Sequence, residues 1–145
     1  MLLVTDANAV VAACLAAGNG FDVFAGHDLL APDLMWWEAA STLHEYLWRI
    51  DADRRTPDMA GLTREDVLAA LQRLLQAPIE RAALDQALLT EAWHVADRCG
   101  FARLYDAAYV ALARQRSATL VTLDGRLRLS PAATLAPIRG PTELQ

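Results

Sequence analysis

Four acidic residues, Asp6, Glu38, Asp106 and Asp124, stand where a folded chain could bring their carboxylates together. Asp6 and Asp124 each follow a short apolar run that passes through a threonine, a pattern typical of a strand that ends at the acid. Glu38 lies just over one turn into a predicted helix, and Asp106 opens another. Carboxylate oxygens are preferred ligands of Mg²⁺ and Mn²⁺, which can lower the pKa of a bound water for attack on a phosphodiester. The four acids are therefore candidates for one metal site.

Strands and helices must alternate along the chain to position these acids. The apolar patterns predict strands at residues 2–5, 29–31, 79–83, 118–122 and 134–138, and helices at residues 9–17, 33–50, 63–76, 84–99 and 104–114. Thr63 and Asp66 are spaced for a capping box at the start of the third helix. The alternation indicates an α/β fold, with a central, mostly parallel sheet of four or five short strands and helices on both faces. In such a sheet the functional crevice lies at the carboxyl ends of the strands, so all four acids can converge there.

The predicted helix at residues 33–50 is apolar almost all round. Its pattern predicts a helix that is buried on most sides, with Trp36, Trp37 and Trp48 in the core. We expect His44, which lies on one of its apolar stripes, to be packed and hydrogen-bonded rather than catalytic.

Each acid, taken singly, also has a purely structural interpretation. Asp6 could be a helix N-cap, Asp106 a charge in the first turn of a helix, and Asp124, which precedes a glycine, a turn former. Glu38 is harder to explain in this way, because it lies on a helix that is expected to be buried and a buried carboxylate without a partner is costly. Since the chain has no lysine, the expected partner of Glu38 is an arginine or a metal ion.

The basic residues exclude several classes of function. All 13 are arginine, so the chain lacks the lysine that a P-loop places on phosphates and that a Schiff-base enzyme uses as its amine. The formal net charge of −5 argues against a protein that coats nucleic acid through bulk positive potential. A nuclease is still compatible with this charge, because four carboxylates set against bound cations leave the rest of the chain close to neutral.

Length and composition favour one domain over residues 1–145, since 145 residues with 54% hydrophobic side chains can bury a sizeable core. Cys14 and Cys99 form no C-x-x-C pair, which fits a reducing cytoplasm. The longest apolar run, residues 9–17, is shorter than the roughly 18 residues needed to span a bilayer. No signal peptide or transmembrane segment is expected, so we predict a cytoplasmic protein without a membrane partner.

The acidic motifs resemble those of a known family. Residues 105–113, YDAAYVALA, and residues 118–127, ATLVTLDGRL, closely resemble the third and fourth acidic motifs of the PIN-domain ribonucleases, in particular the VapC-like toxins of type II toxin–antitoxin modules. Residues 4–8, VTDAN, look like the first motif, and residues 31–34, APDL, leading to Glu38, look like the second. The resemblance covers nearly the whole chain and agrees in the order and rough spacing of the motifs.

This resemblance implies an endoribonuclease that depends on Mg²⁺ or Mn²⁺ and leaves a 5′-phosphate. Asp6, Asp106 and Asp124 would bind metal directly or through water, and Glu38 would be a metal ligand or would orient the attacking water. Two further residues are predicted to support the site. Asn8 and Thr122 would hydrogen-bond the carboxylates or the substrate phosphate, although both could equally be capping residues.

Arginines next to the motifs are candidates for binding the RNA backbone, because a guanidinium matches the geometry of a phosphate. The pair Arg126 and Arg128 is favoured because it lies beside Asp124, and the pair Arg114 and Arg116 is a second candidate. The resemblance also implies a cognate antitoxin and a homodimer, and the mean hydropathy of +0.18 fits a chain with apolar surface to cover. The helices at residues 9–17 and 33–50 are expected to contribute to one or both contacts.

Two other classes of protein also fit parts of the pattern. A receiver-like domain that forms a phosphoaspartate would place Asp6 as its nucleophile at a strand end, but such domains normally rely on a lysine. A catalytically silent PIN-like module that binds RNA or protein would be expected to lose one or more of the acids, and this chain has all four.

Overall fold

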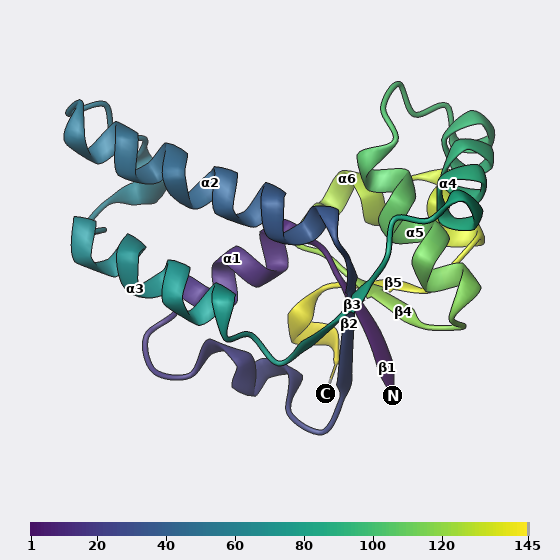
Figure 1. Ribbon diagram of the computed structural model, residues 1–145, viewed down its shortest axis with the longest axis horizontal. Helices are drawn as coiled ribbons and strands as arrows, with labels where there is room; N and C mark the ends of the chain where they lie inside the picture. The colour runs from purple at the N-terminus through teal and green to yellow at the C-terminus, as the bar shows by residue number, and fades with distance from the viewer. Residues whose placement is uncertain (145) are drawn as a thin grey trace.

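The strands form a five-stranded parallel sheet in the computed structural model, which describes residues 1–144 (Figure 1). The strands are β1 (Leu2–Thr5), β2 (Asp28–Pro32), β3 (Ile79–Ala82), β4 (Thr119–Val121) and β5 (Ile138–Arg139). Their order across the sheet is β3-β2-β1-β4-β5, and every neighbouring pair is parallel. The predicted α/β fold with a parallel sheet is therefore confirmed, and β1 lies at its centre.

Helices cover both faces of the sheet, as predicted (Figure 1). The helices α1 (Ala7–Leu15), α2 (Leu34–Asp51) and α3 (Arg64–Leu75) pack on one another on one side, and α4 (Gln86–Cys99) and α5 (Tyr105–Gln115) pack together on the other. A short helix, α6 (Gly125–Arg128), follows β4, and 3-10 turns lie at Gly20–Phe24, Pro57–Met59, Pro131–Thr134 and Pro141–Glu143. No helix within residues 1–144 combines the length and apolar character needed to cross a membrane.

Local capping decides where several helices begin. The Asp6 side chain accepts a hydrogen bond from the Ala9 N–H, so α1 begins at Ala7, two residues before the predicted start. The capping box of Thr63 and Asp66 is confirmed at the start of α3. The bounds of the last predicted strand, residues 134–138, were wrong, because Thr134 belongs to the 3-10 turn Pro131–Thr134 and the strand consists of Ile138 and Arg139.

The expectation that α2 is buried on most sides is wrong. Trp36 is 7% exposed, but Trp37 is 80% exposed and Trp48 is 50% exposed, and His44 is also exposed. The reason is visible in Figure 1, where α2 and α3 run side by side away from the sheet and form an arm. Trp37 and Trp48 therefore face solvent, whereas other apolar side chains of α2, such as Leu34 and Leu47, pack partly against the core.

The central layer that holds the site is tightly buried. Every residue of α5 from Ala107 to Ala113 is buried, and this helix contacts β1, β2 and β4. Five of these seven buried residues are alanine or valine, so the helix can approach the strands closely. The N-terminal turn of α5, with Asp106, is thereby fixed against the end of the sheet where β1 and β4 finish.

Candidate metal centre

The carboxyl ends of the two central strands bring Asp6 and Asp124 to one rim. Thr5 of β1 pairs with Val121 of β4, and the Asp6 N–H donates to the Val121 carbonyl at 3.3 Å. The residues that follow these strands, Asp6 on one and Thr122 on the other, are therefore neighbours across the sheet. This is the placement expected for a functional crevice in an open parallel sheet.

Asp6 is a buried carboxylate among other acids. It is 6% exposed, and its Oδ1 accepts from the Ala9 N–H at 2.9 Å while its Oδ2 accepts from the Thr122 hydroxyl. Burial, together with repulsion from Asp106 and Asp124, raises the pKa of Asp6 to about 6, against the lowering effect of its two hydrogen bonds. The N-cap interpretation of Asp6 is thus correct, but it does not account for a charge buried without a cation.

Thr122 joins the first acid to the fourth. Its buried side chain donates to Asp6, and its Oγ1 accepts from the Asp124 N–H at 2.9 Å. Asp124 in turn caps α6, because its Oδ1 accepts from the Arg126 N–H at 2.9 Å. The hydroxyl of Thr122 therefore contacts two of the predicted ligand residues, whereas Asn8 lies exposed in the first turn of α1.

Glu38 and Asp106 complete the group of acids. The pKa of Glu38 is raised by burial, and Asp106 and Asp6 add repulsion, although a hydrogen bond from the Tyr109 hydroxyl opposes the shift. Asp106 lies at the solvent-facing edge of the site, and partial burial and the charge of Asp124 raise the pKa of its carboxyl while Arg126 lowers it. Each of the four predicted acids thus lies close enough to affect, or to be affected by, the charge of another.

The chemistry of these side chains fits a hard divalent cation. Within residues 1–144, no arginine or histidine comes within salt-bridge distance of Asp6, Glu38 or Asp106, whereas Asp124 has Arg126 beside it, with Nε 3.8 Å from its Oδ1. The same residues 1–144 contain no group of three Asp, Glu, His or Cys side chains that lie close enough together to bind a metal ion without moving. Carboxylates that repel one another stay apart until a cation offsets their charge, so a bound ion would have to draw them inwards.

Comparison with known proteins decides the family. A model of the PIN domain matches residues 3–130, which is most of the chain. The chain belongs to the PIN domain family. A comparison with curated protein sequences gives no match.

Solved structures share the fold of this PIN domain. The VapBC2 structure from Rickettsia felis, bound to a DNA fragment from their promoter, is similar with a TM-score of 0.63 and 13% identity over 97% of this chain and 98% of that one. PAE2754 from Pyrobaculum aerophilum is similar with a TM-score of 0.61 and 24% identity, over 95% of this chain and 89% of that one. VapBC-1 from nontypeable Haemophilus influenzae is similar with a TM-score of 0.62 and 12% identity, over 99% of this chain and 100% of that one. At these identities the similarity concerns the fold alone.

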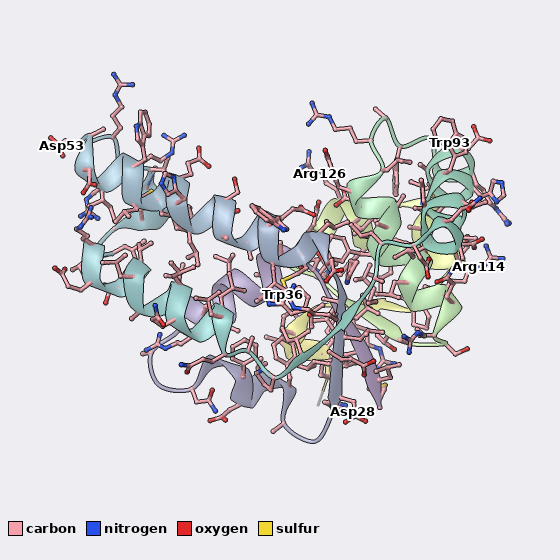
Figure 2. The ribbon with its side chains drawn as sticks, in the orientation of Figure 1. Asp28, Trp36, Asp53, Trp93, Arg114 and Arg126 are labelled. Atoms are coloured by element: carbon pink, nitrogen blue, oxygen red, sulfur yellow. The ribbon has the colours of Figure 1, made fainter. Side chains whose placement is uncertain are left out.

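The four candidate RNA-binding arginines of this PIN domain are not gathered at the acids. The side chain of Arg126 is 97% exposed beside Asp124, whereas Arg128 pairs with Glu143 at 3.1 Å. Arg114 and Arg116 lie at the far end of α5 from Asp106, towards the amino end of β4, and Figure 2 shows Arg114 well away from Arg126. Of these four arginines, Arg126 is the one that is both largely exposed and adjacent to the acids.

Tyr109 was not predicted as a member of the site. An arginine or a metal ion was expected beside Glu38, but the group that contacts Glu38 is the Tyr109 hydroxyl, at 3.1 Å. Tyr109 lies three residues after Asp106, on the helix whose other buried side chains are apolar. A polar atom placed one turn from a candidate ligand on an otherwise apolar helix was the available indication.

The substitution Asp6→Asn tests the buried charge, because it keeps the size of the side chain and an acceptor for Ala9. The folded protein holds the Asp6 proton more tightly than the unfolded chain does, so this group stabilises the fold below about pH 4 and that contribution is lost as the pH rises through about 6. In EDTA at pH 7 we expect D6N to be more stable than wild type by roughly 3 kcal/mol, which corresponds to about two pKa units. Urea unfolding at several pH values measures this difference, which should vanish below about pH 4.

In saturating Mn²⁺ the wild type should instead be more stable than D6N, since a bound cation stabilises the protein that keeps the carboxylate. Asp28→Asn is the matched control, because Asp28 is exposed at the amino end of β2, on the opposite edge of the sheet. Equal stability of wild type and D6N at pH 7 in EDTA would contradict this description of Asp6.

Proposed function

We propose that this PIN domain is an endoribonuclease that requires Mg²⁺ or Mn²⁺ and is the toxin of a toxin–antitoxin pair. The observation that carries the proposal is the buried Asp6 carboxylate, which shares one rim of the sheet with Glu38, Asp106 and Asp124 and has no cationic side chain to neutralise it. The family supports the same activity, since the four acids fall within the matched residues 3–130.

In this proposal each site residue has its own role. Asp6, Asp106 and Asp124 would hold the ion, and Glu38 would ligate it or orient a water for attack on phosphorus. A divalent ion in this place lowers the pKa of bound water and stabilises charge on the phosphate and leaving oxygens. Thr122 links the Asp6 carboxylate to the backbone of Asp124 through its two hydrogen bonds, so the segments that follow β1 and β4 are held together while an ion binds.

A catalytically silent PIN-like module that binds RNA or protein is the second candidate. The spacing of the acids favours it, because they do not form a closed ligand cluster within residues 1–144. The phosphoaspartate alternative has less support, since the proposed nucleophile Asp6 is 6% exposed and both its oxygens already accept hydrogen bonds. RNA cleavage separates the nuclease from both.

Cleavage of bulk RNA with Mn²⁺ or Mg²⁺ tests the proposed activity. We expect wild type to cut and EDTA to stop the reaction. Asp124→Asn and Asp6→Asn should each lower the rate by about two orders of magnitude or more, because several kcal/mol of transition-state stabilisation depend on the metal. Asp28→Asn should cut at the wild-type rate. A folded wild type that binds RNA and never cuts it would favour the silent module.

RNA contact is proposed for Arg126, on the ground of its exposure beside Asp124. Measured in an Asp6→Asn background so that RNA is not cut, Arg126→Ala should weaken binding of single-stranded RNA roughly fivefold, equivalent to about 1 kcal/mol. The slope of log affinity against log salt should fall by about 0.7, the share of one phosphate contact. Arg116→Ala is the matched control, and an equal loss there would mean that RNA also follows the far end of α5.

An antitoxin and a second copy of the chain are the proposed protein partners. Two separate apolar surfaces support them. The first, the α4 face, contains Leu84, Leu89, Trp93 and Tyr105, which are all more than half exposed. The second, the arm groove between α2 and α3, is lined by apolar side chains that include Trp37, Leu43 and Leu68. We assign the α4 face to the homodimer and the arm groove, next to Glu38, to the antitoxin. The sequence had pointed to α1 and α2, and of these only α2 lines either surface, with Trp37 in the groove and Leu34 in the pocket beside Leu84.

Light scattering tests the assignment of the α4 face. Leu89→Glu places a charge on this face and should convert a dimer into a monomer, because an unpaired charge cannot be buried in an apolar interface. Leu68→Glu, on the arm groove, should leave the dimer intact and should instead reduce copurification with the coexpressed cognate antitoxin. Circular dichroism checks that both variants are folded. A wild type that is monomeric at micromolar concentration would contradict the homodimer.

We further propose that residues 1–145 act as one PIN-like nuclease domain in the cytoplasm. The single domain is supported by a hydrophobic core that runs from Leu3 to Ala136, and the location by two cysteines, Cys14 and Cys99, that are both free. Limited proteolysis and cell fractionation would test these two points.

A further inference from the structure

Tyr109 places a buried hydroxyl on one of the candidate ligand residues. The side chain is 1% exposed, and its Oη donates to Glu38 Oε1 at 3.1 Å. The ring packs among the core residues of α5, one turn after Asp106, so only the oxygen reaches the acids. The hydroxyl therefore joins α5 to α2.

Core packing alone does not explain the hydroxyl. All the side chains of α5 from Ala107 to Ala113 except that of Tyr109 are apolar and buried. A phenylalanine in place of Tyr109 would fill almost the same volume. Burying a phenolic oxygen costs free energy unless it is hydrogen-bonded, so its bond to Glu38 is needed to offset that burial. The same bond acts on Glu38 as much as on the tyrosine.

Glu38 has little else to fix its orientation. Its side chain has several freely rotating bonds, and within residues 1–144 it forms no ion pair and no hydrogen bond besides the one from Tyr109. A phenol is protonated at neutral pH, so Tyr109 is a hydrogen-bond donor to one carboxylate oxygen and leaves the other oxygen available. Repulsion from Asp6 and Asp106 would otherwise favour rotamers that point away from the acids.

We propose that Tyr109 is a positioning residue that holds Glu38 ready to ligate a divalent ion together with the acids of β1 and α5. This inference rests on the proposed function, in which Glu38 serves the metal ion. It makes α5 the helix that supplies one ligand, Asp106, and orients another, Glu38, so that the second and third acidic motifs are coupled through a single turn of helix. Hydrogen-bond partners of ligating carboxylates commonly set the affinity of a metal site.

Mn²⁺ binding to the full chain, measured by calorimetry and by loss of the free-ion electron paramagnetic resonance signal, tests the role. Tyr109→Phe removes only the hydroxyl, and we expect it to weaken Mn²⁺ binding by about tenfold, the lower end of the range for such partners. Glu38→Asp withdraws the carboxylate from Tyr109 without changing the core, and it should lose affinity as well. The double variant should bind Mn²⁺ no more weakly than Glu38→Asp alone, because Tyr109 acts through Glu38.

Tyr105→Phe is the matched control, since Tyr105 lies on the same helix with its side chain 58% exposed. It should bind Mn²⁺ as wild type does. A Tyr109→Phe protein that loses stability to urea but keeps wild-type Mn²⁺ affinity would overturn the positioning role, and so would losses that multiply in the double variant. A wild type that binds no Mn²⁺ and cuts no RNA would overturn the proposed function too, whereas one that does both while Tyr109→Phe behaves identically would overturn only this inference.

Discussion

Burial of a carboxylate beside other acids at one rim of the sheet is the constraint on which the rest of this structure depends. Asp6 is held there at the end of β1 by its hydrogen bonds from Ala9 and Thr122, and burial still raises its pKa to about 6. Ionising such a group in the folded protein costs free energy, roughly 3 kcal/mol for a shift of this size. The free energy of unfolding of a typical domain is only about 5–15 kcal/mol, so ionised Asp6 lowers it by a substantial fraction. The acids can remain close only because the surrounding backbone is rigid.

That rigidity comes from small side chains and from capping. The run of buried alanine and valine in α5 lets the helix lie close to β1, β2 and β4, so Asp106 cannot move away from the sheet without opening the core. Asp6 and Asp124 each cap the helix that follows, which ties both carboxylates to backbone N–H groups. The structural and the functional interpretations of these aspartates are therefore not alternatives. The capping bonds are what fix the direction of the remaining oxygens.

The sequence predicted the features that depend on local pattern and failed on those that depend on tertiary contacts. Asp6 and Asp124 were placed correctly at neighbouring strand ends because parallel strands finish at the same edge of a sheet. The exposure of Trp37 and Trp48 was not foreseen, since an apolar helix has the same pattern whether it is buried in its own chain or lies in a projecting arm. The bond between Tyr109 and Glu38 joins residues 71 positions apart, and no local pattern encodes which buried side chain meets Glu38.

The cost of the buried charge also determines how the proposed ion and the fold would be coupled. A ligand that binds only the folded state stabilises it by about 2.7 kcal/mol when present at a hundred times its dissociation constant. This is close to the roughly 3 kcal/mol that ionised Asp6 costs. A single ion at that saturation would thus restore about as much folding stability as ionised Asp6 removes. No stronger core is then needed to tolerate the acids. Glu38 and Asp106, whose pKa values are raised by the same burial and repulsion, act in the same direction, so the folded state and the occupied site would favour each other.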